Sequence, residues 1–158
     1  MTAQLTMLTW RNVHLADTLV SEELNARLSA EAGCSLIEHD LMAWLAVTPG
    51  RRLRMLDLAD RLRVSQGGLT RIVDRLVARG WIERDRPAGN RREVHVILAE
   101  AGAVAWAAAR ATYSRVLQET LASYLGERDL ETLRRIAGKL LTRAAADQAL
   151  HCLPPTCY

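Results

Sequence analysis

The chain has 158 residues, of which 49% are apolar and 25% charged, with 21 basic side chains against 18 acidic ones. This length allows one ordinary domain with a helical arm and excludes a large multidomain enzyme, while the apolar content excludes a disordered chain. Because residues 1–10 lack a signal-peptide pattern and no run of about 18 apolar residues occurs, we expect a soluble, cytoplasmic protein with no membrane contact. The three cysteines Cys34, Cys152 and Cys157 are too few for a disulfide framework, which fits a reducing compartment.

The placement of the arginines carries more information than the net charge of +3. Lys139 is the sole lysine, and residues 51–92 hold twelve arginines against five acids, a net charge of +7. The rest of the chain is net negative. A basic segment between acidic flanks is the electrostatic pattern of nucleic-acid binding within an otherwise neutral scaffold. A solvated arginine-rich surface is the alternative that composition leaves open.

The predicted elements begin with one long helix. Apolar residues recur at helical spacing from residue 5 to about residue 32, and no Pro or Gly interrupts them before Gly33. A second helix is predicted over residues 36–47, where the turn signal Thr48-Pro49-Gly50 ends it. Residues 51–54 can form only a very short strand.

Two further helices follow with the spacing of a helix-turn-helix. The first spans residues 55–62, with three residues expected to face inward: Leu56, Ala59 and Leu62. Ser65 is the expected N-cap of the second, which runs from Gln66 to Arg79 and is closed by Gly80. Its buried stripe is predicted at helical spacing: Leu69, Ile72, Val73, Leu76 and Val77.

The opposite face of this last helix carries Gly67, Arg71, Asp74 and Arg75. Two arginines one turn apart, beside glycines that let the backbone approach closely, suit a DNA major groove, where arginine pairs with guanine or phosphate. An ordinary solvated helix face is the alternative.

A β-hairpin is predicted directly after these helices. Residues 81–85 alternate as a strand, residues 86–92 form a turn-rich basic loop, and residues 93–98 alternate again. A hairpin in this place is a wing, and the arginines at its tip would reach the minor groove or the flanking phosphates.

These segments together resemble a known family. The stretches are LDLADRL at 56–62, VSQGGLTRIVDRL at 64–76, RGWIER at 79–84 and NRREVHVIL at 90–98. Over about residues 30–102 they are similar to the winged-helix core of the MarR family of bacterial transcriptional regulators. The family's wing pattern is matched at Arg92, Val96, Leu98 and Gly102. Asn90 replaces its acid, and Ala99 replaces the threonine that would cap the next helix, a loss of about 1 kcal/mol.

The resemblance implies a mainly α fold with a small β-hairpin wing. A winged helix-turn-helix domain would span 33–99, a helical dimerisation region would combine 1–32 with 100–150, and 151–158 would be a tail. The chain would be a homodimeric repressor that binds a pseudo-palindromic operator in double-stranded DNA. The last helices, predicted over about 100–124 and 127–150, agree with dimerisation, since the final one has a larger apolar stripe than a winged helix can cover: Leu130, Leu133, Ile136, Leu140 and Leu141.

We predict DNA contacts from the start and outward face of the second helix of the helix-turn-helix and from the wing loop. The residues are Ser65, Gln66, Gly67, Thr70, Arg71, Arg75, Arg86, Arg91 and Arg92. An RNA-binding winged helix is an alternative from another class, but it would lack the exposed aromatic platform that single-stranded RNA recognition uses.

The sequence contains no phosphate-binding loop, metal-ligand motif or nucleophile elbow, so we expect neither an enzyme nor a cofactor or metal. The resemblance implies release from DNA by a small aromatic or anionic ligand. Trp10 and His14 on the first helix, with His39 and Trp44 on the second, could line such a pocket, although ordinary amphipathic packing is the alternative. A redox response through Cys34 or the tail cysteines is a further alternative.

Overall fold

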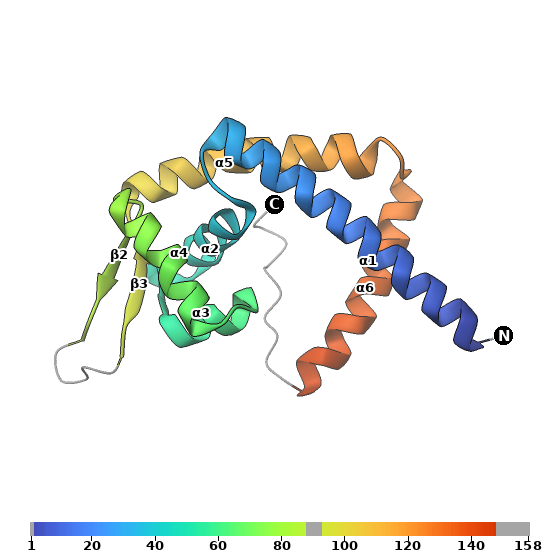
Figure 1. Ribbon diagram of the computed structural model, residues 1–158, viewed down its shortest axis with the longest axis horizontal. Coiled ribbons are helices and arrows are strands. Elements are labelled where there is room, and N and C mark those ends of the chain that lie inside the picture. The colour runs from blue at the N-terminus through green and yellow to red at the C-terminus, as the bar shows by residue number, and fades with distance from the viewer. Residues whose placement is uncertain (1, 88–92, 148–158) are drawn as a thin grey trace.

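The computed structural model describes residues 2–87 and 93–147, with side chains as far as residue 141. Six α-helices and a three-stranded antiparallel sheet make up this part of the chain (Figure 1). The predicted fold class, mainly α with a small hairpin wing, is confirmed. Among the described residues, no helix has the length and apolar character to cross a membrane.

Most helices and strands lie where the hydrophobic periodicity predicts them. The helices are α1 (Thr2–Arg27), α2 (Leu36–Val47), α3 (Met55–Leu62), α4 (Gln66–Ala78), α5 (Glu100–Leu117) and α6 (Glu127–Asp147). The strands are β1 (Arg52–Arg54), β2 (Ile82–Asp85) and β3 (His95–Leu98). A short 3-10 turn, η2 (Pro49–Arg51), precedes β1, and π-helical turns continue α1 and α5 as η1 (Leu28–Ala32) and η3 (Gln118–Ala122).

At the junction between α1 and α2, a C-terminal cap at Gly33 is followed two residues later by an N-terminal cap at Ser35. Gly33 has a φ of 66°, a conformation that a glycine adopts without steric cost, and its N–H bonds to the Leu28 carbonyl. Ser35 then caps α2, and a reciprocal capping box joins Ser35 to Glu38. Gly33 therefore ends the first helix, as the sequence predicts.

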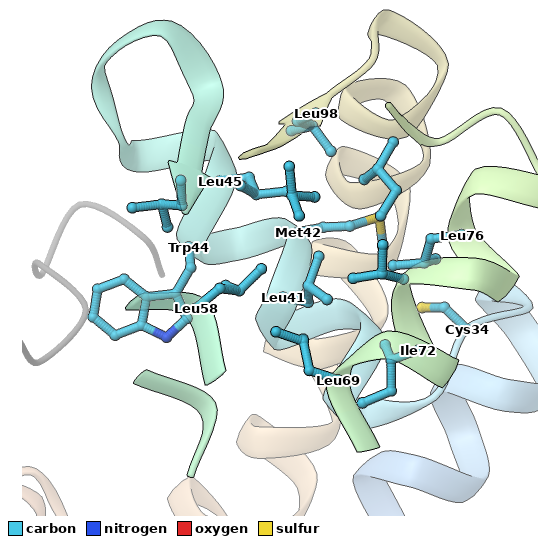
Figure 2. Packing of buried hydrophobic residues seen from close by; sticks show 14 of the residues in the cluster. Cys34, Leu41, Met42, Trp44, Leu45, Leu58, Leu69, Ile72, Leu76 and Leu98 are labelled. Atoms are coloured by element: carbon cyan, nitrogen blue, oxygen red, sulfur yellow. The ribbon is translucent and has the colours of Figure 1, made fainter. Parts of the chain in front are cut away.

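The hydrophobic core lies where α2 crosses α4 and the sheet (Figure 2). Leu41, Met42 and Leu45 of α2 are fully buried against the stripe of α4. In that stripe Leu69, Ile72, Val73 and Leu76 are buried as predicted, but Val77 is 36% exposed at its edge.

The inward face of α3 was predicted wrongly at Leu56. That side chain is 55% exposed, whereas Leu58 and Ala59 face the core. Two residues along a helix correspond to about 200° of rotation, so burial of Leu58 directs Leu56 outward.

The wing is fixed to α5 by close backbone contact. β3 is the central strand, paired with β1 on one side and β2 on the other. The Ala99 N–H donates to the Trp81 carbonyl at 3.0 Å, and a Cβ on Gly102 would lie 1.9 Å from the same oxygen. Glycine at 102 thus permits the start of α5 to lie against the hairpin. Ala99 is the N-cap of α5 and provides no side-chain cap, as its sequence predicts.

The first half of α1 and the whole of α6 lie to the right of the winged helix in Figure 1. Both carry large apolar side chains that the described chain leaves exposed. On α1 these include Leu5, Leu8, Leu15 and Leu19, and on α6 Leu133, Ile136, Leu140 and Leu141.

Candidate nucleic-acid interface

The N-terminal half of α4 presents polar side chains to solvent. Ser65 Oγ accepts the Gly68 N–H at 3.1 Å, and Thr70 Oγ1 donates to the Gln66 carbonyl at 2.9 Å. Both hydroxyl groups are therefore engaged within the helix. The Gln66 side chain and the Gly67 backbone lie exposed at the first turn, where a helix N-terminus attracts phosphate.

Arg71 and Arg75, predicted as a pair, have different surroundings. Arg71 is exposed and has no ion-pair partner within the described part of the chain. Arg75 donates from Nε to Glu38 Oε1 at 2.9 Å. The two arginines are one turn apart on α4, yet only Arg71 has its whole guanidinium available.

A groove of about 630 Å³ separates α4 from the wing and the start of α3. Its polar rim includes Gln66, Thr70 and Arg86 from the predicted set, while Leu56 and Val94 add apolar surface. The lining contains both basic and acidic side chains, and the basic ones can approach a phosphate backbone that lies between a recognition helix and a wing.

Sequence reasoning missed Arg54 and Arg84, which also line this groove. Arg54 pairs with Glu93 at 2.7 Å, and Arg84 pairs with Asp74 of α4 at 2.7 Å. The signal for Arg84 was present, because it lies two residues after the buried Ile82 and so faces α4 by strand alternation.

A polar network joins the strands at the base of the wing. Arg52 pairs with Asp85 at 2.7 Å and donates to His95 Nδ1 at 3.0 Å, and His95 Nε2 lies 3.2 Å from Glu93. This pattern fits a neutral imidazole that accepts at Nδ1 and donates from Nε2. Arg86 is exposed just beyond β2, and the predicted contacts Arg91 and Arg92, with Asn90, lie outside the described residues.

The ring contacts within the described residues do not bring the four residues predicted for a ligand pocket together in the single chain. Trp10 and His14 stack on each other at 6.0 Å on the exposed half of α1. His39 is buried and stacks on Tyr113 at 4.5 Å, with Nδ1 3.1 Å from Asp40.

Trp44, the fourth of these residues, is buried beneath the guanidinium of Arg61. Within the described residues, His39 Nε2 and Trp106 Nε1 are buried without a hydrogen-bond partner. The pocket stays a prediction, and these two nitrogen atoms are the polar groups that a ligand could satisfy.

Cys34 is 1% exposed and packs beside α4 (Figure 2). Burial, followed by the negative charge of Glu38, raises the pKa of this thiol to about 11. Because the thiolate is the reactive form, Cys34 is a poor nucleophile at neutral pH. Cys152 and Cys157 lie outside the described residues.

The α3–turn–α4 pair, the hairpin that follows it and the flanking long helices define a winged helix-turn-helix protein. The model of the MarR family matches residues 32–93. The winged-helix segment of this chain is therefore similar to the MarR family. A search of curated protein sequences found no match.

Solved structures extend the similarity over nearly the whole chain. Sco3205, a MarR family transcriptional regulator from Streptomyces coelicolor in complex with DNA, is 26% identical with a TM-score of 0.80, and 94% of each chain is covered. A mutant MarR from E. coli complexed with operator DNA is 24% identical with a TM-score of 0.75, covering 89% of this chain and 99% of that one. The transcriptional regulator BldR from Sulfolobus solfataricus is 24% identical with a TM-score of 0.77, covering 90% and 99%. All three are described as regulators or as bound to operator DNA, and none as an enzyme.

Proposed function

We propose that this chain is a homodimeric transcriptional regulator that binds a pseudo-palindromic DNA operator and represses by occupying it. The observation that carries the proposal is the exposed, unpaired Arg71 on α4 beside a groove with an arginine-rich rim. Sco3205 and the MarR mutant were solved with DNA, which supports the same ligand for this fold.

In this proposal the N-terminal half of α4 enters the major groove. Arg71 donates to a guanine edge, Gln66 pairs with an adenine edge, and Gly67 lets the backbone approach. Arg86 lies along the groove beside α4, where it approaches phosphate. The wing arginines at 91–92 contact the minor groove or flanking phosphates.

Dimerisation through 1–32 and 100–150 is supported by the apolar surface of α1 and α6. Leu15 and Leu19 of α1 are more than half exposed, as is Leu140 of α6. Contiguous exposed apolar side chains of this kind mark a protein–protein interface. A second copy that pairs these helices across a two-fold axis places two α4 helices about one DNA turn apart.

A small aromatic or anionic effector would act between α2 and α5. The support is the buried His39 Nε2 and Trp106 Nε1, which lack partners in the described part of the chain. Trp106 Nε1 can donate to a carboxylate or phenolate. His39, whose Nδ1 donates to the Asp40 carboxylate, can accept at Nε2 from a phenol hydroxyl, and an aromatic ring can join the stack of His39 on Tyr113.

Selection of binding sites by the purified full-length chain from random double-stranded DNA tests the proposal. The expected result is a pseudo-palindrome with half-site centres about 10 base pairs apart. A parallel selection from random RNA is the control for the alternative class. Enrichment of RNA alone, or of no sequence in either pool, would overturn the proposal.

A further inference from the structure

Glu38 lies where the long helix α1 meets the winged helix. It is the third residue of α2, and its side chain is only 5% exposed. Oε2 accepts the Ser35 N–H at 2.9 Å, while Oε1 accepts Arg75 Nε at 2.9 Å. One buried carboxylate therefore holds the first turn of α2 and the second half of α4 together.

Arg79, one turn after Arg75, contacts the same junction. Its Nη1 donates to the Gly33 carbonyl at 2.6 Å and lies 4.0 Å from Glu38 Oε2. Its guanidinium also lies 4.8 Å from the centroid of the Trp81 ring. The last turn of α4 and its C-cap residue are thus tied to the segment that joins α1 to α2.

The carboxylate of Glu38 needs these partners. Burial alone raises its pKa, but the Ser35 N–H and the Arg75 guanidinium outweigh that effect and hold the pKa below its ordinary value. Glu38 is then charged at neutral pH, and a buried charge without a partner is strongly unfavourable. Arg75 is accordingly held on Glu38 by a charge-assisted hydrogen bond and is not available in full to DNA.

The position of Arg75 along α4 agrees with this role. Base edges are contacted by the N-terminal residues of a recognition helix. Arg75 lies about 6 Å further along the helix axis than Arg71, at 1.5 Å per residue. Arg71 lies in the N-terminal half of α4, whereas Arg75 lies in its last turn, at the end that the α1–α2 junction holds.

We propose that Glu38 is a positioning residue for operator recognition, which acts through Arg75 to fix the angle between α4 and the α1–α2 junction. The inference rests on the DNA-binding dimer proposed above. In such a dimer α1 belongs to the dimerisation region, so this angle determines whether both α4 helices match the half-site spacing. Arg75 is then an anchor, and base recognition belongs to Arg71.

The test compares Arg75→Ala with the matched control Arg71→Ala. Each purified full-length variant is titrated with the selected operator, with operators one base pair shorter or longer between half-sites, and with single-base variants, over a salt series. For Arg75→Ala we expect binding about tenfold weaker, because a charge-assisted hydrogen bond is lost. We also expect the spacing preference to be lost, with the ranking of base variants and the salt slope unchanged. Arg71→Ala should flatten the ranking and keep the spacing preference.

Glu38→Gln tests the carboxylate itself, because glutamine retains an oxygen for the Ser35 N–H but no charge for Arg75. The double variant Glu38→Gln, Arg75→Ala should bind no more weakly than Arg75→Ala alone, since both changes remove one interaction. Circular dichroism confirms folding. Arg75→Ala leaves the Glu38 carboxylate buried without its guanidinium, so the double variant, which removes that charge as well, decides the question if either single variant is unstable.

Two results would overturn the inference. One is a fall in the salt slope of about one unit for Arg75→Ala, which would make Arg75 a phosphate contact. The other is an unchanged spacing preference in that variant. Both results require a parent chain that binds its operator. If the parent chain binds no DNA at all, the proposed DNA-binding function is wrong, and this outcome differs from either result that would refute the role of Glu38.

Discussion

Gly102 offers a sharp test of how the wing is attached to the long helix α5. A Cβ at this position would lie 1.9 Å from the Trp81 carbonyl oxygen and 2.9 Å from Leu98 Cδ1. Contacts of a Cβ below 3.0 Å are essentially never found, so Gly102→Ala requires a displacement of at least 1.1 Å, the difference between 3.0 Å and 1.9 Å. The obstructing atom belongs to the backbone and cannot rotate away as a side chain could.

Overpacking of this kind costs about 1–3 kcal/mol, and here the upper part of that range applies because the hydrogen bond from Ala99 to Trp81 must also be distorted. Alanine regains about 1 kcal/mol of helix propensity over glycine. We therefore expect Gly102→Ala to lower the free energy of unfolding by about 2 kcal/mol.

Gly138 in α6 provides the matched control, since a Cβ there meets nothing within 4 Å. Gly138→Ala should raise the free energy of unfolding by about 0.5–1 kcal/mol. Urea denaturation at one fixed protein concentration measures both changes, because dimerisation makes stability depend on concentration. Equal effects of the two substitutions would refute the close contact between α5 and the hairpin.

Four further outcomes are expected. Arg71→Ala should weaken operator binding by about 1–3 kcal/mol in a gel-shift titration without change in the melting temperature. Alanine at both wing arginines, 91–92, should lower the salt slope by about one unit per phosphate contact and leave the ranking of operators unchanged. The pKa of Glu38 in the folded chain is below its ordinary value of 4.5. The ionised carboxylate therefore contributes its full share of the free energy of unfolding above pH 4.5, and this share is lost as the pH falls through the lowered pKa. Glu38→Gln should lack this loss of stability in an acid titration. Leu15→Glu should shift sedimentation toward the monomer, whereas Leu56→Glu, equally exposed but on α3, should not.

Local signals in the sequence were sufficient for most of the fold. Helix ends were predicted at Gly33, Ser65 and Gly80, because a left-handed backbone conformation or a side-chain cap depends only on neighbouring residues. The structure has a helix boundary at each of them. The error at Leu56 arose because a helix of eight residues leaves two adjacent angular positions that fit an inward stripe almost equally. Packing against α2 selects one of them, and that information is not local.

The candidate site was less accessible from the sequence. Arg71 and Arg75 share one face by helical spacing, so periodicity assigns them the same role. The partner that separates them, Glu38, is 37 residues away in the chain. The capping box that the structure shows at Ser35 uses only one of the two Glu38 carboxylate oxygens. The other carboxylate oxygen accepts a hydrogen bond from Arg75, and this contact depends on the fold rather than on neighbouring residues.

Not every arginine of the basic segment at residues 51–92 is available for DNA. Arg52, Arg54, Arg75 and Arg84 each contact a carboxylate. When an arginine of such a pair contacts a DNA phosphate, it exchanges its carboxylate partner for the phosphate. The free energy of DNA binding therefore gains little from the contact. Arg71 has no carboxylate partner within the described residues, so its contact with DNA adds its full interaction to the free energy of binding. Among the described arginines of the segment, those paired with a carboxylate stiffen the winged helix, whereas Arg71 can recognise DNA; the division depends on the positions of the acids rather than on the number of arginines.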